Sequence, residues 1–484
     1  MVSAGKPTLI ATPQVKNLSL SWPLILVVIL AIVRGVLYLS IFPPFLAPDE
    51  AAHFEAIRLI GQEKKWPTAE VYATTPMHLE MIPTFEKYRI WYLANQDPSN
   101  QNVGLTTGLF TDYYAAQISA GAVRANSYLM LYHLTLAPLS AATASFDLTT
   151  QVYLLRFVSV LFTAATVVIA WITVKTIFPA QPGLALAVVS FITLWPMHTH
   201  VGASVTVDPL AELLASAFFL LLIKIWVNGF SLLKAVSVVG LLALAILTKP
   251  TTFFLLPSLA AALTVFLGRW LKWSPRLTFG LLGLLVVLTL VGSILLHQYS
   301  DGGRRVLSLL ATPFNLPAWE DLVTDRTLSF YVGVLNFAVL SFAGLFGWSN
   351  IHIPWVWVRW WAVGLFLIGL GSLIFCYQCL LRPVHPGEED STQQKSILIF
   401  LLLALIFSFI GVATPIIGSE SSSWGIHSRY YFPAIIPLAL YLYLGFRQLF
   451  PGGWRNFALP VWIVGWFTYD CVVLFIVILP YLYS

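Results

Sequence analysis

The chain has 484 residues, of which 58% are hydrophobic, 14% aromatic and only 10% charged, with a formal net charge of +5. A charged fraction so far below the globular norm of about 25% excludes an ordinary soluble domain, because too much apolar surface would face water. Lys and Arg are scattered among short loops rather than gathered in a basic patch, so nucleic acid is not an expected partner.

Long apolar segments recur along the chain and predict about eleven membrane-spanning helices, or up to about 13 if two ambiguous segments also cross. An isolated segment crossing the hydrocarbon core must be helical, because every backbone polar group has to be satisfied internally. The predicted spans begin near Pro23, Phe157, Leu184, Pro209, Phe230, Thr251, Leu277, Trp361, Ser396, Tyr430 and Phe457. We therefore expect an all-α polytopic integral membrane protein, with residues 1–484 forming one transmembrane domain.

The first apolar segment runs from Pro23 to Ile41 and is preceded by Lys6 and Lys16. It is too long and poorly placed for a cleaved signal peptide, so we expect it to remain as an anchor. Residues 1–22 then form a cytoplasmic tail, and the protein is expected in the plasma (inner) membrane.

Two apolar stretches are ambiguous, Tyr128 to Leu139 and Phe330 to Trp348, because they are short or interrupted by Gly, Asn and Ser. If neither crosses the membrane, the basic residues of the connecting loops all fall on the cytoplasmic side, as positively charged loops prefer. These residues are Lys175, Lys224, Lys234, Arg269, Lys272, Arg276, Arg382, Lys395, Arg447 and Arg455. We therefore expect both stretches to lie on the outer membrane surface as juxtamembrane helices.

This topology leaves two large external regions, residues 42–156 and residues 298–360. The first is rich in Trp, Tyr and Ile and is expected to fold with short helices rather than to act as a linker. It opens with FPPFLAPDEAAHF, which places two adjacent carboxylates directly after the first span.

These carboxylates are Asp49 and Glu50. An ordinary helix N-cap after Pro48 would account for Asp49 but not for Glu50. Glu50 and His53 also form an ExxH pattern, which is half of a di-iron site, but the second copy that such a site needs is absent from the sequence. A mononuclear divalent metal ion at Asp49, Glu50 and His53 stays open as an alternative.

Further charged residues fall on the same predicted external face. They are Asp208 in HVGASVTVDPL, Lys249 in LTKPTT, Arg304 and Arg305 in SDGGRRV, and His427 and Arg429 in GIHSRYYFP. Each has a structural alternative: Asp208 as a helix cap, Lys249 as a snorkelling side chain, and the arginines as solvated or lipid-headgroup contacts. Acids and bases gathered at one membrane border suit a reaction between a lipid-borne phosphate and a hydroxyl acceptor.

The chemistry of such a donor explains these residue types. A sugar on a polyprenyl phosphate is activated, because the phosphate leaves with its own negative charge and needs no general acid. One carboxylate then suffices to take the proton of the acceptor hydroxyl, whereas glycosidases usually need two carboxyl groups. Arg and Lys can hold the departing phosphate and stabilise its charge.

Several motifs resemble the DUF2142 family of bacterial membrane proteins. PDEAAHFEAIRLI is similar to the family's PPDEPAH signature, and SFAGLFGWSNI is similar to its SFWxxFGW stretch. SVTVDPLAELL, LTKPTTFFLLP and HSRYYFPAIIPL agree as well, so the resemblance covers most of the chain in the expected order. PDEAAH lacks the second Pro of the signature, and TVD, which contains Asp208, replaces a more usual Asn-containing stretch.

That family in turn resembles the GT-C superfamily of membrane glycosyltransferases, which use lipid-phosphate sugars. The resemblance implies that Asp49 is the base, that Glu50 supports it and that Asp208 is the second acidic position. It also implies that Lys249 and Arg429 hold the donor phosphate. Enzymes of this superfamily differ in their need for a metal.

We therefore predict a GT-C-like glycosyltransferase with its active site on the extracytoplasmic side. It would move a sugar from a polyprenyl-phosphate donor to a lipid, glycan or protein acceptor, with inversion at the anomeric carbon. The alternatives are a transporter or flippase of a lipid-linked saccharide and a noncatalytic envelope assembly subunit. Arg34, Glu212 and Asp470 lie within apolar segments and keep the carrier alternative open.

Overall fold

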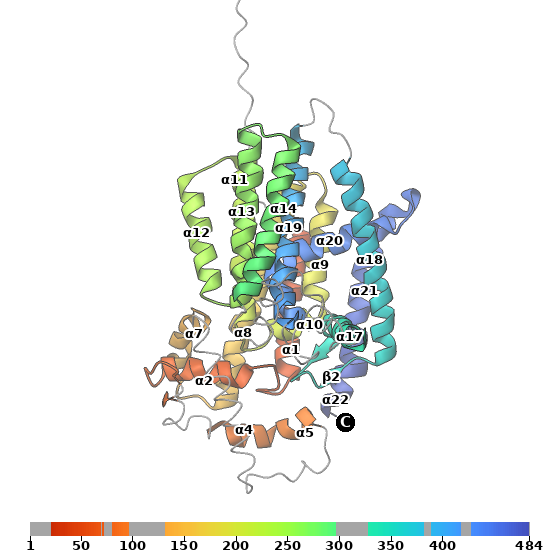
Figure 1. Ribbon diagram of the computed structural model, residues 1–484. Helices are drawn as coiled ribbons and strands as arrows, with labels where there is room; N and C mark the ends of the chain where they lie inside the picture. Colours follow the sequence, from red (N-terminus) through yellow and green to blue (C-terminus); the bar gives the residue numbers. More distant parts are fainter. Residues whose placement is uncertain are drawn as a thin grey trace, which may run out of the picture.

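The computed structural model describes residues 21–68, 70–71, 80–95, 131–296, 328–381, 389–417 and 427–483. These residues are mainly helical. They also include two strands of two residues each, β1 (Leu345–Phe346) and β2 (Ile351–His352), which pair antiparallel. Figure 1 shows long helices running side by side, with short helices gathered at one end. We call this end the loop end of the bundle.

The long direction of the bundle is set by a series of apolar helices. They are α1 (Trp22–Ile41), α8 (Leu148–Ile177), α9 (Pro182–Leu194), α11 (Asp208–Asn228), α12 (Leu232–Ile246), α13 (Leu255–Trp270), α14 (Pro275–Leu296), α18 (Trp355–Leu381), α19 (Glu389–Ile417), α20 (Ile435–Gln448) and α21 (Ala458–Val472). The last of these continues through a π-helical turn, Val473–Ile478, into α22 (Leu479–Tyr483).

Shorter elements lie mainly at the loop end. They are α2 (Glu50–Gly61), α4 (Ile82–Lys87), α5 (Ile90–Asn95), α7 (Leu131–Ala142), α10 (Pro196–Gly202), α17 (Leu328–Gly344) and the 3₁₀ helices η3 (Pro250–Phe254) and η4 (Ser428–Ala434). A further 3₁₀ helix, η5 (Gly452–Phe457), precedes α21.

Within the described residues, seven helices are long and apolar enough to cross a membrane, or up to eight if one bent pair counts as a single span. Three more apolar helices are shorter, at Leu232–Ile246, Arg276–Gly292 and Val332–Gly344. The chain is therefore an all-α, multi-pass membrane protein, as the composition predicts. The number of eleven spans stays a prediction.

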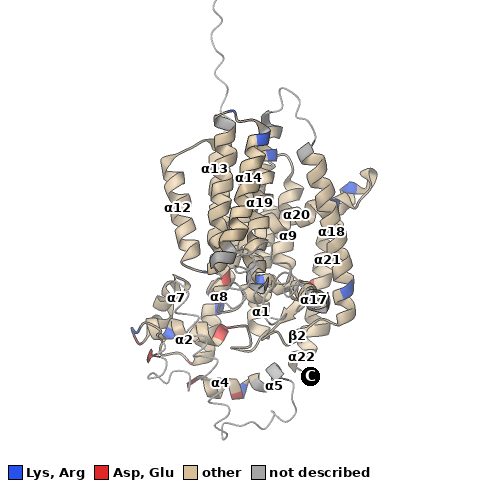
Figure 2. Ribbon diagram, viewed as in Figure 1, with Lys and Arg blue, Asp and Glu red and all other residues tan. Residues whose placement is uncertain are grey.

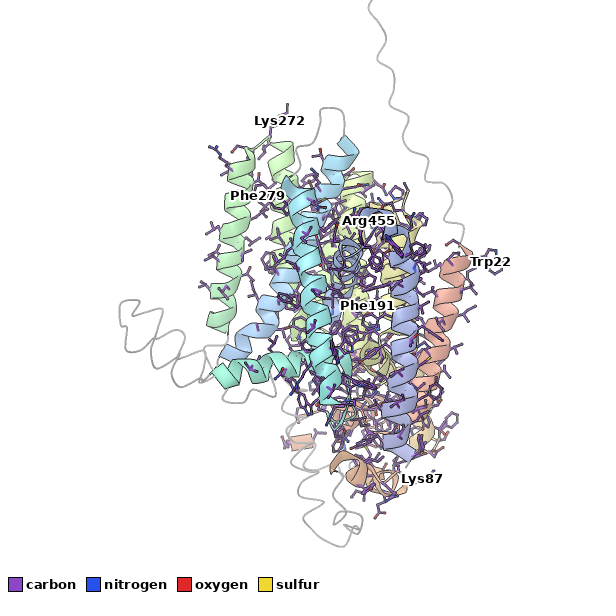
Figure 3. All side chains as sticks on the ribbon, turned by 90° about the vertical axis from the view of Figure 1, so that its right-hand side faces the viewer. Trp22, Lys87, Phe191, Lys272, Phe279 and Arg455 are labelled. Atoms are coloured by element: carbon purple, nitrogen blue, oxygen red, sulfur yellow. The ribbon has the colours of Figure 1, made fainter. Side chains whose placement is uncertain are left out.

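The two ambiguous segments of the sequence correspond to α7 and α17. Helix α7 packs against α2 at the loop end. Helix α17, drawn in teal, lies across the direction of the long helices in both Figure 1 and Figure 3. Neither segment is among the helices that meet the length and hydropathy needed for a span. Their position on the outer membrane surface stays a prediction, because it depends on which way the bundle faces.

Three long helices, α8, α18 and α19, begin earlier than the apolar pattern predicts, and α19 starts at Glu389 instead of Ser396. Helix α8 begins at Leu148 instead of Phe157, where the side chain of Asp147 caps it by accepting a hydrogen bond from the backbone N–H of Thr150 at 3.1 Å. Helix α18 likewise begins at Trp355 instead of Trp361. Hydropathy detects only the part of a helix that fits the hydrocarbon core, whereas the helix itself continues into the polar border. The end of the first external region at residue 156 therefore stays a prediction.

One apolar segment is broken. Helices α9 and α10 meet at Trp195 and Pro196 with a bend of 65°. Pro196 has no backbone N–H and disfavours helical geometry in the preceding residue, and Trp195 is accordingly extended, with φ −75° and ψ 112°. The break turns α10 into the protein interior, where all of its residues are buried.

Charged residues lie mostly near the two ends of the bundle, and the ribbon between them is largely free of charged positions (Figure 2). The deep exceptions Arg34 and Asp470 pair with each other: Arg34 donates through Nε to Asp470 Oδ2 at 2.9 Å and through Nη1 to Thr199 at 2.8 Å. The hydroxyl of Tyr38 also donates to Asp470 at 2.9 Å. This network joins α1, α10 and α21, and it accounts for a buried acid that the sequence leaves unexplained.

Candidate functional site

The loop end of the bundle brings together most of the predicted site residues. Asp49 precedes α2, Asp208 begins α11, and Lys249 precedes η3. His427 and Arg429 lie at the start of η4. The contacts below join them into one cluster, although they come from four distant parts of the chain. Arg304 and Arg305 lie outside the described residues.

Asp49 pairs with Arg429. The Nη2 of Arg429 donates to Asp49 Oδ2 at 2.7 Å, and the Asp49 side chain is 39% exposed against 13% for Arg429. Asp49 holds the N-cap position of α2, but its side chain makes no capping hydrogen bond there. Its backbone is left-handed, with φ 58°, a conformation that Asp tolerates better than most residues. Capping alone therefore does not explain Asp49, whose carboxylate faces a cation from the other end of the sequence.

Asp208 forms a second acid–cation pair, with Lys249. The Nζ of Lys249 donates to Asp208 Oδ1, and both side chains are almost fully buried. Thr206 donates to the other carboxylate oxygen at 2.8 Å. The hydrogen bonds that Asp208 accepts thus come from the side chains of Lys249 and Thr206.

Tyr430 connects the two pairs. The Nζ of Lys249 lies 5.1 Å from the centroid of the Tyr430 ring, and the Cζ of Arg429 lies 5.4 Å from it. Both distances suit a cation–π contact. Sequence reasoning did not single out Tyr430, although it follows Arg429 directly.

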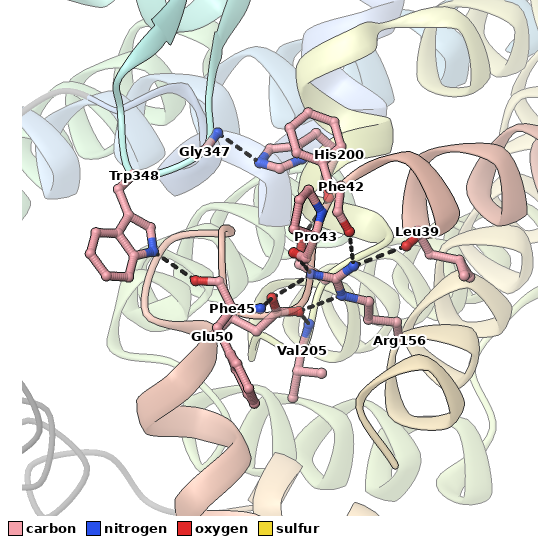
Figure 4. Close-up of polar contacts among 11 residues, drawn as sticks. Leu39, Phe42, Pro43, Phe45, Glu50, Arg156, His200, Val205, Gly347 and Trp348 are labelled. Atoms are coloured by element: carbon pink, nitrogen blue, oxygen red, sulfur yellow. Dashed lines mark hydrogen bonds and ion pairs between the residues drawn. The ribbon is translucent and has the colours of Figure 1, made fainter. Parts of the chain in front are cut away.

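Glu50 takes a different role from Asp49. Its side chain is fully buried and accepts four hydrogen bonds: two from the Arg156 guanidinium at 2.7 and 2.6 Å, and one each from the backbone N–H of Phe45 and Val205 at 2.8 and 2.9 Å (Figure 4). Such a saturated carboxylate has little capacity left for a substrate. The geometry makes Glu50 a structural centre that ties the loop before α2 to α8 and to the segment before α11.

Arg156 completes this centre. Besides Glu50, it donates to the backbone carbonyls of Leu39, Phe42 and Pro43 at 2.6 to 2.9 Å (Figure 4). The loop that carries Asp49 is thus fixed where it leaves α1. Sequence reasoning missed Arg156. The signal that the sequence offers for it is a charged residue directly before a long apolar run.

The FGW stretch packs against the same loop. The indole N–H of Trp348 donates to the carbonyl of Phe45 at 2.9 Å, and the N–H of Gly347 donates to His200 Nε2 at 3.3 Å (Figure 4). Gly347 has φ +62°, which a residue without Cβ adopts at little cost. All five motifs of the family resemblance therefore meet around the loop end.

His53 pairs with His133 of α7 rather than with the carboxylates. The two ring nitrogens, Nδ1 and Nε2 respectively, lie 3.0 Å apart. Glu50 and His53 point to different partners, so the ExxH pattern does not converge on one point. Among the described residues, no group of three or more His, Cys, Asp or Glu side chains is placed to hold a metal ion. A divalent metal ion stays an open prediction.

Burial determines the charge state of these histidines. It lowers the pKa of His53 from its ordinary value, although Asp49 acts in the opposite direction. Burial lowers the pKa of His133 further, and His53 adds to this effect. Both rings are therefore neutral at pH 7, and one must donate to the other.

Acidification is expected to destabilise this region. The unfolded histidines take up protons near pH 6.5, whereas the folded His53 and His133 do so only at lower pH. The unfolded state thus binds more protons between pH 7 and pH 5, and the melting temperature should fall over that range. His133→Gln, which keeps a polar partner without titrating, should reduce this fall, and His352→Gln, at the exposed residue of β2, should not. An equal pH dependence in all three proteins would contradict the assignment.

Comparisons with family models, with curated proteins and with solved structures found no match. The family resemblance therefore rests on the quoted motifs, and the function has to be argued from the site itself.

Proposed function

We propose that this protein is a membrane glycosyltransferase with a GT-C-like fold, moving a sugar from a polyprenyl phosphate to a hydroxyl acceptor. The acceptor is a lipid, a glycan or a protein. The bundle would contain about eleven spans, and its loop end would face away from the cytoplasm at the plasma membrane. Lys272 and Arg455 lie at the opposite end of the bundle from Lys87 (Figure 3). Loops rich in Lys and Arg prefer the cytoplasmic side, so this opposite end would be the cytoplasmic one.

The observation that carries the proposal is the cluster of two acid–cation pairs around Tyr430. Asp49–Arg429 and Asp208–Lys249 place both kinds of charge, from separate parts of the chain, at one border of an apolar bundle. A lipid-anchored phosphate would lie at this depth, with its chain among the apolar helices. The motif resemblance to DUF2142 proteins points the same way.

In the proposed reaction, the acceptor hydroxyl attacks the anomeric carbon from the face opposite the phosphate. Asp49, the more exposed of the two acids, takes the hydroxyl proton as the new bond forms. The bond between the anomeric carbon and the phosphate oxygen breaks, and polyprenyl phosphate leaves. Arg429 and Lys249 stabilise its charge, while Asp208 orients Lys249. Inversion follows from this single displacement.

The carrier alternative depends on charges inside the bundle. Arg34 and Asp470 neutralise each other. Both carboxylate oxygens of Glu212 lie 2.9 Å from Nε2 of His198. These contacts give each deep charge a structural partner. They favour the enzyme over a carrier, in which such groups would line a passage.

Donor consumption tests the proposal. Purified protein in lipid vesicles, supplied with a panel of polyprenyl-phosphate sugars and candidate acceptors, should release polyprenyl phosphate. Arg429→Gln should lower the rate by about 100-fold or more, because a donor to the leaving phosphate is lost. Arg455→Gln, at the opposite end of the bundle, should keep the rate, because Arg455 donates to Gln448 rather than to a residue of the cluster. Failure of the wild type to consume any donor would contradict the function.

A further inference from the structure

The neutral imidazole of His427 carries its proton on Nε2. Its Nδ1 accepts a hydrogen bond from the backbone N–H of Arg429 at 3.4 Å. Burial lowers the pKa of His427 well below its usual value, so the ring is neutral at pH 7 and bears one N–H. Since Nδ1 accepts, that proton lies on Nε2. The Nε2 atom is buried and has no hydrogen-bond partner among the described residues.

Arg429 supplies a second donor of the same kind. Its Nη2 contacts Asp49, whereas its Nε is buried and has no hydrogen-bond partner within the described part of the chain. A buried N–H without an acceptor is unfavourable, and native structures rarely keep one without a reason. Two such donors, two positions apart in the chain, indicate a place for ligand oxygen atoms.

The surrounding contacts hold both donors in place. The backbone N–H of Ser428 donates to Ser341 Oγ at 3.0 Å, and its hydroxyl donates to the Ser341 carbonyl at 2.7 Å, which fixes η4 against α17. Lys249 lies close by, against the Tyr430 ring that also contacts Arg429. Both cations pair with carboxylates, so the ligand is indicated by the two N–H donors that lack an acceptor, which suit the several acceptor oxygens of a phosphate.

We propose that the Nε2–H of His427 and the Nε–H of Arg429 together bind the oxygens of one phosphate group while Nη2 of Arg429 remains on Asp49. This inference rests on the proposed function for the lipid-borne source of the phosphate. One guanidinium then connects the base to the leaving group. Asp49 and the phosphate are thereby held at a fixed separation, with the anomeric carbon between the acceptor hydroxyl beside Asp49 and the phosphate that leaves.

Two replacements of His427 separate its two nitrogens. Asn can supply an acceptor near the position of Nδ1 but no donor at Nε2, whereas Gln reaches the Nε2 position and donates there. His427→Asn should therefore weaken binding of polyprenyl phosphate about 10- to 100-fold, as expected for a lost hydrogen bond to a charged group. His427→Gln should stay within about twofold of the wild type. Binding is measured in nanodiscs of zwitterionic lipid, after melting curves establish that each variant is folded.

The outcomes are distinct. Wild-type affinity in His427→Asn, or an equal loss in His427→Gln, would overturn the donor role of Nε2. Inorganic phosphate and neutral polyprenol serve as parallel probes, and polyprenol should bind alike to all variants. If only inorganic phosphate shows the His427 dependence, the phosphate site stands and the lipid-linked donor of the proposed function fails.

Discussion

Asp49→Asn is expected to abolish sugar transfer while leaving the protein folded and able to bind polyprenyl phosphate. Asn cannot accept the hydroxyl proton, and loss of a general base typically lowers a rate by about 10²- to 10⁴-fold. Asn has nearly the same shape as Asp and tolerates the left-handed backbone at position 49, where φ is 58°. The substitution therefore removes the proton acceptor with little strain on the loop.

The matched control is Glu80→Gln. Glu80 also pairs with an arginine, Arg58, at 2.7 Å, and its side chain is 58% exposed. Transfer should be unchanged in this variant, because no role in the cluster is assigned to Glu80. Binding of polyprenyl phosphate to Asp49→Asn should equal or exceed that of the wild type, since a negative charge near the phosphate is gone. Wild-type transfer by Asp49→Asn would remove Asp49 from the reaction.

The helical membrane architecture could be predicted from the sequence because the lipid environment leaves few choices. A run of apolar residues such as Pro23 to Ile41 has to form a helix, and α1 covers Trp22–Ile41. The break between α9 and α10 also has a local signal, Pro196, which sequence reading passed over. Helix ends were less predictable, since α8 extends to Leu148 through residues that hydropathy does not mark.

The topology also predicted that four site residues would lie near one another, because loops on one side of a bundle with short connections have little room to separate. These residues are Asp49, Asp208, Lys249 and Arg429. Which acid pairs with which cation could not be predicted from the sequence. Arg429 is 380 positions from Asp49, and Lys249 is 41 from Asp208, so no local pattern selects either partner. The same limit hides His133, whose contact with His53 depends on how α7 packs on α2.

The role of Glu50 shows this limit most clearly. Its neighbour Asp49 has the same charge and the same position beyond α1, and sequence reasoning grouped the two as catalytic. The backbone separates them: Asp49 precedes α2 in a left-handed conformation and is turned toward Arg429, whereas Glu50 begins the helix and is turned into the protein toward Arg156. Which face is inward depends on the packing of α8, and this is not encoded next to position 50.

Arg156→Met is expected to cause the largest loss of stability among single substitutions at the loop end. It removes the cation beside a fully buried carboxylate and leaves three backbone carbonyls without their donor. Breaking a buried ion pair on one side typically costs about 3 to 5 kcal/mol. The loop carrying Asp49 would lose its anchor to α8, so transfer activity should fall along with the melting temperature.

A double substitution separates the ion pair from the rest of the fold. Glu50→Gln combined with Arg156→Met removes the unpaired charge, and it should be more stable than Arg156→Met alone. Glu63→Gln is the surface control: Glu63 lies 3.7 Å from Lys65, both side chains are about half exposed, and such pairs contribute little. Melting curves in detergent measure all four proteins. If Arg156→Met melts at the temperature of Glu63→Gln, Glu50 and Arg156 do not anchor the loop, and the positioning of Asp49 needs another cause.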